Sequence, residues 1–143
     1  MISPDRLLTD EIGRGIMRVR RLIFTEAGKR LESERQSMLA WQALAYLDLL
    51  GTMPQVALAE GLGQHAAGIS RLVNDLVRDR LVSRKKPVND RRVVLVKLSR
   101  KGKARLEAGR PLVESAVEDI LAPLDRDDRR ALRNLLWRMI PQK

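Results

Sequence analysis

Cysteine is absent from this chain of 143 residues, and histidine occurs only once, as His65. The lack of cysteine excludes disulfides, thiol catalysis, redox sensing by thiols and cysteine-ligated zinc. The sequence also lacks a histidine–nucleophile pair, a phosphate-binding glycine loop and a cluster of metal ligands, so we expect no enzyme activity, metal or cofactor. We interpret His65 as a polar residue at a helix start, with a role in pH sensing or DNA reading as the alternative.

Long apolar runs are missing as well. No stretch approaches the ~20 apolar residues that span a bilayer. Acidic residues occur near the N-terminus before any apolar run, whereas a signal peptide has a long apolar run there. We therefore expect a cytoplasmic protein. An apolar content of 44% argues against disorder, and the length predicts one domain, residues 1–143.

Positive charge is concentrated in one part of the chain. Between Leu62 and Lys103 there are 12 Lys/Arg and 3 Asp/Glu, a net charge of +9, whereas the whole chain has 28 and 18, a net charge of +10. The same window is rich in Ile, Leu and Val, so the charge belongs to a folded element rather than to a tail. This pattern indicates a polyanionic partner, with double-stranded DNA as the leading candidate and a solvated basic face as the alternative.

Apolar residues at spacings of three and four predict a mainly α-helical chain. Side chains that cap helices well predict helix starts at Ser3, Ser99 and Asp125. The short helix that starts at Thr52-Met53-Pro54 is expected to turn Val56, Leu58, Ala59 and Leu62 inward. At residues 81–86 and 93–98 the spacing of apolar residues changes to two, which is typical of β-strands. These two runs predict a β-hairpin around the turn formers of 87–92. The expected helices are 4–34, 38–50, 52–63, 66–80, 99–121 and 125–140.

A short helix, a tight turn, a second helix and a basic hairpin are the parts of a winged helix-turn-helix. We place this lobe at 38–103, its recognition helix at about 66–80 and its wing at about 81–98. The predicted DNA-facing residues of the recognition helix are Gln64, His65, Ala67, Gly68, Ser70, Arg71, Asn74 and Arg78. Arg71 suits guanine and Asn74 or Gln64 suits adenine, although each side chain could instead contact phosphate.

The hairpin supplies the other predicted contacts, which are Arg84, Lys85, Lys86, Asp90, Arg91 and Arg92. The lysines of the stem suit phosphates, and the arginines of the tip suit the minor groove, whose negative potential attracts guanidinium. Asp90 is expected to hold a neighbouring arginine by a charge-assisted bond. The alternative is a turn former that caps its own loop.

Four motifs in order carry a family resemblance. Gln-x-x-Leu-Ala-x-x-Leu-Gly runs from Gln55 to Gly63, and Ile-Ser-Arg-Leu-Val occupies 69–73. The wing pattern Asp-x-Arg lies at 90–92, and Leu-Ser-x-x-Gly lies at 98–102. The run from Gln55 to Gly102 thus resembles the DNA-binding half of the MarR family (multiple antibiotic resistance regulators). The flanking helices are similar to those of the family in length and apolar pattern.

The resemblance implies a homodimeric transcriptional regulator, by default a repressor, that binds a palindromic site. It implies that Arg92 enters the minor groove with Asp90 orienting it, and that Ser70 and Arg71 contact DNA. The chain departs from the family at the cap His65, at Ala66-Ala67-Gly68 in place of small hydroxyl residues, and at Arg80 in place of a frequent glycine. The first two departures affect base specificity rather than DNA binding. At Arg80 the turn must either avoid positive φ or adopt it at a cost.

Three further expectations keep their alternatives. The apolar stripes of 4–34 and 104–143 indicate dimerisation helices, unless they fold back on their own subunit. Trp41, Tyr46 and Arg18 are candidates for a small-molecule effector pocket, although the two aromatic residues also suit the core. Sequence-tolerant architectural DNA binding is the rival function, because it would use the same basic surface.

Overall fold

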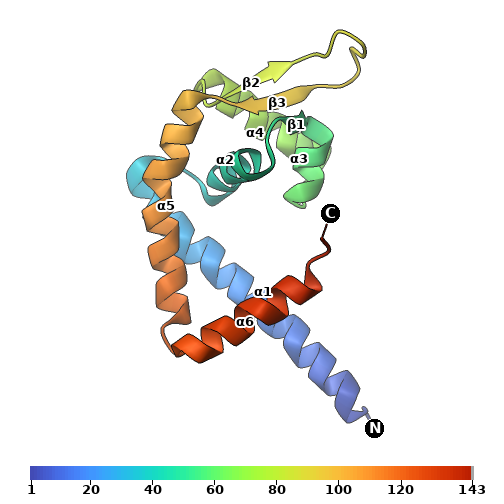
Figure 1. Cartoon of the computed structure of the whole chain (residues 1–143), viewed down its shortest axis with the longest axis vertical. Helices are drawn as coiled ribbons and strands as arrows, with labels where there is room; N and C mark the ends of the chain where they lie inside the picture. Colours follow the sequence, from blue (N-terminus) through green and yellow to red (C-terminus); the bar gives the residue numbers. More distant parts are fainter. Residues whose placement is uncertain (143) are drawn as a thin grey trace.

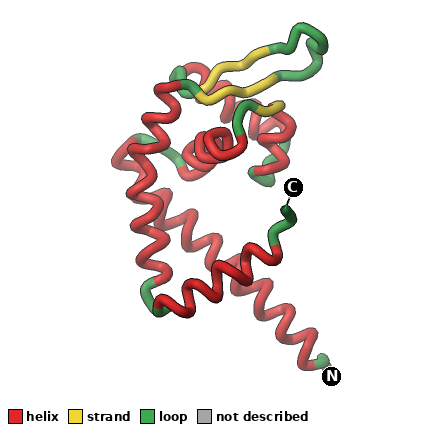
Figure 2. Tube along the Cα trace, viewed as in Figure 1, coloured by secondary structure: helices red, strands yellow, loops and turns green. Residues whose placement is uncertain are grey.

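The computed structural model describes residues 1–142, which form a mainly helical chain with one small antiparallel sheet (Figures 1 and 2). This architecture confirms the predicted fold class. The helices are α1 Pro4–Leu31, α2 Met38–Leu50, α3 Gln55–Gly61, α4 Ala66–Arg78, α5 Arg100–Leu121 and α6 Arg126–Met139, with a 3-10 turn η1 Glu32–Glu34 after α1. The strands are β1 Met53–Pro54, β2 Val82–Lys85 and β3 Leu95–Leu98, in the sheet order β1-β3-β2.

Side-chain caps start the helices where the sequence predicts them. Ser3 accepts from the N–H of Arg6 at 3.3 Å, and Ser99 accepts from the N–H of Gly102 at 2.9 Å. Asp125 accepts from the N–H of Asp128 at 2.8 Å. Each such cap contributes about 1 kcal/mol, because it satisfies a backbone donor that has no partner within the helix.

The segment after α2 differs from the prediction. Gly51 turns the chain at φ 85°, and Met53 and Pro54 then pair with Val96 and Leu95 as a third strand instead of starting a helix. The reason is that a residue before proline favours extended backbone. The helix therefore begins at Gln55, and Val56 is 68% exposed rather than turned inward.

Two apolar clusters form the core. The larger one lies beneath the sheet and α3–α4, and the smaller one joins the end of α1 to α2 and α5. Trp41 packs against both. The winged helix-turn-helix is thereby packed against α5. Fully buried members of the larger cluster include Leu44, Leu58, Ile69, Val73, Val96 and Leu106, and the smaller cluster consists of Ala27, Leu31, Met38, Val113 and Ala116.

The two ends of the chain are exposed. The first 22 residues lie outside both clusters, and the N-terminal part of α1 projects away from the rest of the chain in Figure 1. After the turn at Pro123, α6 also has no buried residue. Residue 143, the last of the predicted range 104–143, lies outside the described residues. Within residues 1–142, no helix has the length and apolar content of a membrane span.

Candidate nucleic-acid interface

Helix α4 presents two distinct faces. Ile69, Val73 and Leu76 are buried against α2, α3 and the sheet, whereas Arg71 and Arg78 on the opposite face are exposed. The helix is two residues shorter than predicted because Asp79 caps it and Arg80 turns the chain. Its exposed face has the dimensions that a major groove accepts.

The start of α4 is small and has no side-chain cap. His65 occupies the N-cap position, is exposed, and makes no capping hydrogen bond. A Cβ added at Gly68 would meet nothing within 4 Å, so internal packing does not require a glycine there. Ala67 is exposed, and Gln64 and Ser70 are partly exposed. Together these residues leave room for close approach of a nucleic acid backbone.

Arg84 has a role that the sequence did not suggest. From β2 its guanidinium donates to Asn74 Oδ1 on α4, to Gln55 Oε1 on α3 at 3.2 Å and to the carbonyl oxygen of Ser70 at 3.3 Å. One wing residue thus joins both helices of the helix-turn-helix. Arg84 therefore anchors the wing to the recognition helix instead of pointing freely toward phosphates.

The same bond changes the expectation for Asn74. A bidentate contact to adenine uses both the amide oxygen and the amide nitrogen of asparagine. In this structure Asn74 Oδ1 already accepts from Arg84. The amide nitrogen of Asn74 remains able to donate, which suits a phosphate or a base acceptor. The predicted reading of adenine would require the oxygen to be shared or the bond to Arg84 to break.

The wing carries its charge without internal neutralisation. Strands β2 and β3 pair from Val82↔Leu98 to Lys85↔Leu95, and the segment between them forms turns. Within residues 1–142 none of its basic side chains forms an ion pair, so their charge is available to a partner. These exposed residues are Lys85, Lys86, Arg91 and Arg92.

Asp90 acts on the backbone of the wing. Its Oδ1 accepts from the N–H of Arg92 at 2.9 Å, and within residues 1–142 Asp90 makes no ion pair with an arginine. The predicted charge-assisted bond to a guanidinium is therefore not what the structure contains, and the alternative of a loop-capping turn former is the observed arrangement. The physical reason is the spacing of two residues, over which an aspartate readily caps its own turn.

The junction of α4, wing and α5 is tight. Arg80 takes the left-handed conformation, with φ 61°, so the turn adopts positive φ without a glycine rather than avoiding it. Its carbonyl oxygen accepts from Ser99 Oγ at 2.7 Å. A Cβ on Gly102 would lie 2.0 Å from the carbonyl oxygen of Leu81, so only glycine fits there. The motif around Ser99 and Gly102 thus fixes where the wing leaves the lobe.

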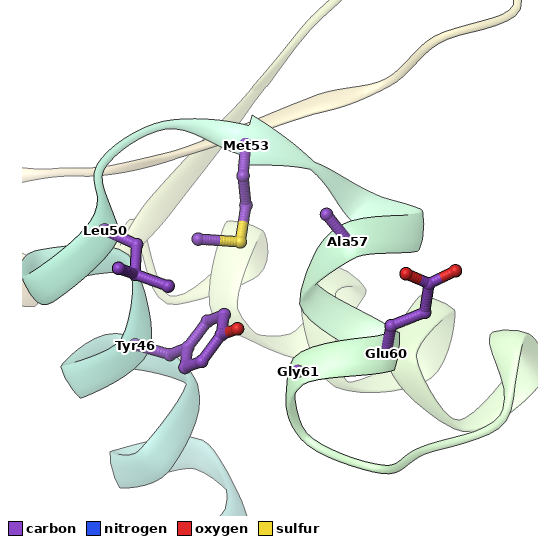
Figure 3. Close-up of a pocket in the computed structure, with 6 residues that line it drawn as sticks. All are labelled: Tyr46, Leu50, Met53, Ala57, Glu60 and Gly61. Atoms are coloured by element: carbon purple, nitrogen blue, oxygen red, sulfur yellow. The ribbon is translucent and has the colours of Figure 1, made fainter. Parts of the chain in front are cut away.

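The three predicted effector residues do not meet in one cavity. Trp41 donates from Nε1 to the carbonyl oxygen of Leu106 at 3.1 Å and packs in the core. Tyr46 lines a cavity of about 530 Å³ in which its ring points toward α3 and Met53 points toward the ring (Figure 3). Arg18 lines a separate cavity on α1. Trp41 is thus half-buried against the core, with its indole nitrogen paired inside the fold.

Metal ligands do not gather in the part of the chain that the structure describes. Residues 1–142 contain no group of three or more His, Cys, Asp or Glu side chains placed to hold an ion.

Known proteins resemble this chain in sequence and in fold. The MarR family model matches residues 34–93. The uncharacterized HTH-type transcriptional regulator YdgJ of Bacillus subtilis is 31% identical over 74 residues, which cover 52% of this chain and 45% of that protein. The match thus spans less than half of that curated relative.

Solved structures match over nearly the whole chain. A probable transcriptional regulator from Pseudomonas aeruginosa is 31% identical, with a TM-score of 0.76 and coverage of 93% of this chain and 99% of that one. Wild-type MarR of E. coli in its apo form is 25% identical, with a TM-score of 0.82 and coverage of 99% and 100%. A mutant MarR of E. coli in complex with operator DNA is also 25% identical, with a TM-score of 0.78 and coverage of 92% and 94%. With its winged helix-turn-helix and exposed basic wing, this chain matches the MarR family model over most of its winged helix-turn-helix and the solved MarR structures over nearly its whole length, so it is a winged-helix protein of the MarR type.

Proposed function

We propose that a homodimer of this chain, acting in the cytoplasm, recognises a palindromic operator and represses transcription by occluding a promoter. The observation that carries this proposal is the pairing of an exposed face on α4 with a wing whose cations are unneutralised. Helix α4 would lie in the major groove, and the wing tip would reach the adjacent minor groove.

The dimer is inferred from the two ends of the chain. Helix α1 exposes Leu8, Ile12 and Ile16, and α6 exposes Leu135 and Met139, although all of these residues are apolar. A partner subunit is the economical cover for two apolar helices that leave the core of their own chain. Since a two-fold dimer on one face of the duplex must meet successive major grooves, its half-sites should be centred about 10 bp apart.

The roles of individual DNA contacts follow from position. Arg71 is exposed on α4 and forms no ion pair within residues 1–142, so we assign it to a base edge in the major groove. Lys85 is the last residue of β2 and Lys86 follows it, and both are assigned to phosphates. Arg91 and Arg92 are assigned to the minor groove.

Competition between genomic fragments tests the proposal against architectural DNA binding, which the small uncapped start of α4 would also permit. A regulator should bind one class of fragment about 10³-fold or more tightly than random DNA. Equal retention of all fragments would favour the architectural alternative.

Two substitutions then separate reading from anchoring. Arg71→Ala should cost about 1–3 kcal/mol on the selected site and relax the preference at one base pair of each half-site. Lys86→Ala should weaken binding to all DNA alike and reduce the salt slope by about one per subunit. If Arg71→Ala lowers the affinity for selected and for random DNA by the same factor, Arg71 contacts phosphate rather than a base. That result would favour architectural DNA binding over sequence-specific regulation.

A further inference from the structure

One guanidinium group organises the junction of α3, α4 and β2. Arg84 is exposed on β2 and forms no ion pair within residues 1–142. Instead, each of its three side-chain nitrogens donates to a different acceptor. Nε donates to Gln55 Oε1 at 3.2 Å, Nη2 donates to the carbonyl oxygen of Ser70 at 3.3 Å, and Nη1 donates to Asn74 Oδ1. Because the bond to Ser70 is made with the backbone of α4, the group has a defined place beside the recognition helix.

The contact with Arg84 fixes the orientation of the Asn74 amide. A guanidinium carries only donors, so the amide atom that faces it must be the oxygen. The amide nitrogen Nδ2 keeps both of its hydrogens, and it has no acceptor within residues 1–142. Asn74 is exposed and lies on the same face of α4 as Arg71 and Arg78. The recognition helix therefore offers an incoming base a donor from Asn74, whereas the acceptor of this side chain is already occupied.

A free asparagine and an asparagine held in this way suit different bases. A free amide pairs with adenine, because its oxygen accepts from N6 and its nitrogen donates to N7. With Arg84 bound to Asn74 Oδ1, the guanidinium N–H and the adenine amino group would compete for one oxygen. Guanine presents two neighbouring acceptors in the major groove, N7 and O6, so a donor alone suffices. Cytosine presents a donor, N4, against the donor of Asn74. The occupied oxygen thus favours guanine.

We propose that Arg84 is a positioning residue that sets the base preference of Asn74 to guanine rather than adenine, at one base pair of each half-site. Arg84 does so without touching the base, by holding the amide oxygen. The inference rests on the proposed recognition of an operator by α4. It gives the wing a part in reading the major groove, in addition to the contacts that the wing makes with DNA itself.

Selection from a pool of DNA duplexes of random sequence tests this assignment on the full chain. Asn74→Ala identifies the base pair concerned, because it should erase one preference in each half-site and keep the others. The wild-type protein should select guanine there. Arg84→Met keeps the aliphatic stem but removes every donor, so the freed amide should select adenine, with a gain of about tenfold relative to guanine. Adenine in the wild type, or the same base frequencies in Arg84→Met, would overturn the proposal.

Two further variants separate the held amide from charge and from folding. Lys85→Met removes the same charge at the next position of β2, so it should weaken binding to all DNA alike and keep the preference for guanine. In Asn74→Asp the carboxylate still accepts from Arg84 but has no donor. This variant should exchange the preference for guanine for one for cytosine, whose N4 donates. Retention of guanine by Asn74→Asp would show that the amide nitrogen does not read the base.

Magnetic resonance of the free protein tests the contact without DNA. The side-chain amide signals of Asn74 and Gln55 should shift in Arg84→Met and stay in place in Lys85→Met, because Arg84 alone donates to both amide oxygens. Unshifted signals would overturn the proposal. If the signals shift but the wild-type protein selects no sequence, operator recognition fails and the base preference fails with it. A selected sequence whose base frequencies do not change in Arg84→Met removes this inference alone.

Discussion

Two arginines hold backbone conformations that favour glycine. Arg35 has φ 54° and Arg80 has φ 61°, each directly after a helical element. A side chain in this region brings Cβ close to the following carbonyl oxygen, at a cost of about 1–2 kcal/mol. The chain accepts this strain at Arg80 because the turn there places the wing against α5, where Ser99 binds the carbonyl oxygen of Arg80.

Replacing Arg80 by glycine should therefore stabilise the protein. We expect the free energy of unfolding to rise by about 1 kcal/mol, because glycine adopts the left-handed conformation without strain. Urea denaturation measures the change. Arg80→Ala is the matched control, since it removes the same side chain and keeps the strain. Equal effects of Gly and Ala would show that backbone conformation is not the cause.

Asp90 gives a second test at the scale of one residue. Because its carboxylate binds the N–H of Arg92, Asp90→Ala should weaken DNA binding even though it removes a negative charge from the wing. Asp90→Asn should retain affinity, since an amide oxygen also accepts that bond. Titration of the selected DNA fragment at fixed salt is the measurement. Loss of affinity in Asn as large as in Ala would instead support the charge-assisted bond to an arginine.

At the scale of elements, Arg84 couples the wing to the helix-turn-helix. Its bonds to Gln55, Ser70 and Asn74 connect β2 with α3 and α4. Only the planar guanidinium offers donors to three partners at once in this fork geometry. The orientation of the wing relative to α4 thus depends on one side chain as well as on the strand ladder.

A double-mutant cycle on Arg84 and Asn74 should reveal this coupling. Each single change to alanine loses the shared bond, so the effects on unfolding should be non-additive by about 0.5 kcal/mol or more. Arg84→Lys should behave like Arg84→Ala for DNA affinity, because lysine keeps the charge without the fork. Additive effects, or full function with lysine, would reduce Arg84 to a general positive charge.

A surface network ties α5 to α2. Lys103 Nζ lies 2.8 Å from an Asp48 carboxylate oxygen and 3.2 Å from Glu107 Oε1, and Arg110 binds the other oxygen of Glu107 at 3.1 Å. Hydrogen bonds from Arg110 and then from Lys103 hold the pKa of Glu107 below its ordinary value of 4.5. The hydrogen bond to Asp48, followed by that to Glu107, raises the pKa of Lys103 above 10.5.

The lowered pKa of Glu107 sets the direction of a pH effect. Its contribution to stability is complete above pH 4.5, the ordinary pKa, and is lost as the pH falls through the lower value of the folded protein. Glu107→Gln should therefore flatten the decline of the urea midpoint below pH 4.5, and leave its slope near neutral pH unchanged. An unaltered acid limb in the variant would contradict this account.

For the whole molecule, the exposed apolar ends decide the proposed assembly. Residues of α6 contribute nothing to either core cluster, so the lobe should fold without them. Deleting the residues after Leu124 should then give a monomer that has lost tight DNA binding. Sedimentation measures the assembly, and a truncated chain that stays dimeric would contradict the proposal.

A point substitution guards against misfolding of the truncated chain. Leu135 is 54% exposed, so Leu135→Glu removes no packing within the chain but would bury a charge in the proposed dimer interface. We expect it to lower the dimer fraction. Val88→Glu is the control, because Val88 is fully exposed in the loop between β2 and β3, at the far end of the wing from α1 and α6 (Figure 1).

Local patterns in the sequence determined three features of the protein: the spacing of apolar residues determined the helices, capping side chains determined their starts, and short motifs carried the family resemblance. These are local properties, since each depends on residues a few positions apart: Ser3, Ser99 and Asp125 cap helices with groups three residues away. The basic window also followed from the sequence, because charge needs no fold to be counted. The sequence therefore gave good grounds for the winged helix and for DNA as the partner.

Contacts between distant residues were decided only by the tertiary structure. The strand β1 exists because Met53 meets Val96, and Arg84 reaches Gln55 across 29 positions of the chain. The hydrogen bond of Trp41 to Leu106 and its packing against both clusters likewise depend on contacts with α5, 65 positions along the chain. The side-chain oxygen of Gln36 is buried and, within residues 1–142, unpaired only when α2, α4 and α5 close around it, because hydrogen-bond satisfaction depends on three-dimensional neighbours rather than on sequence order.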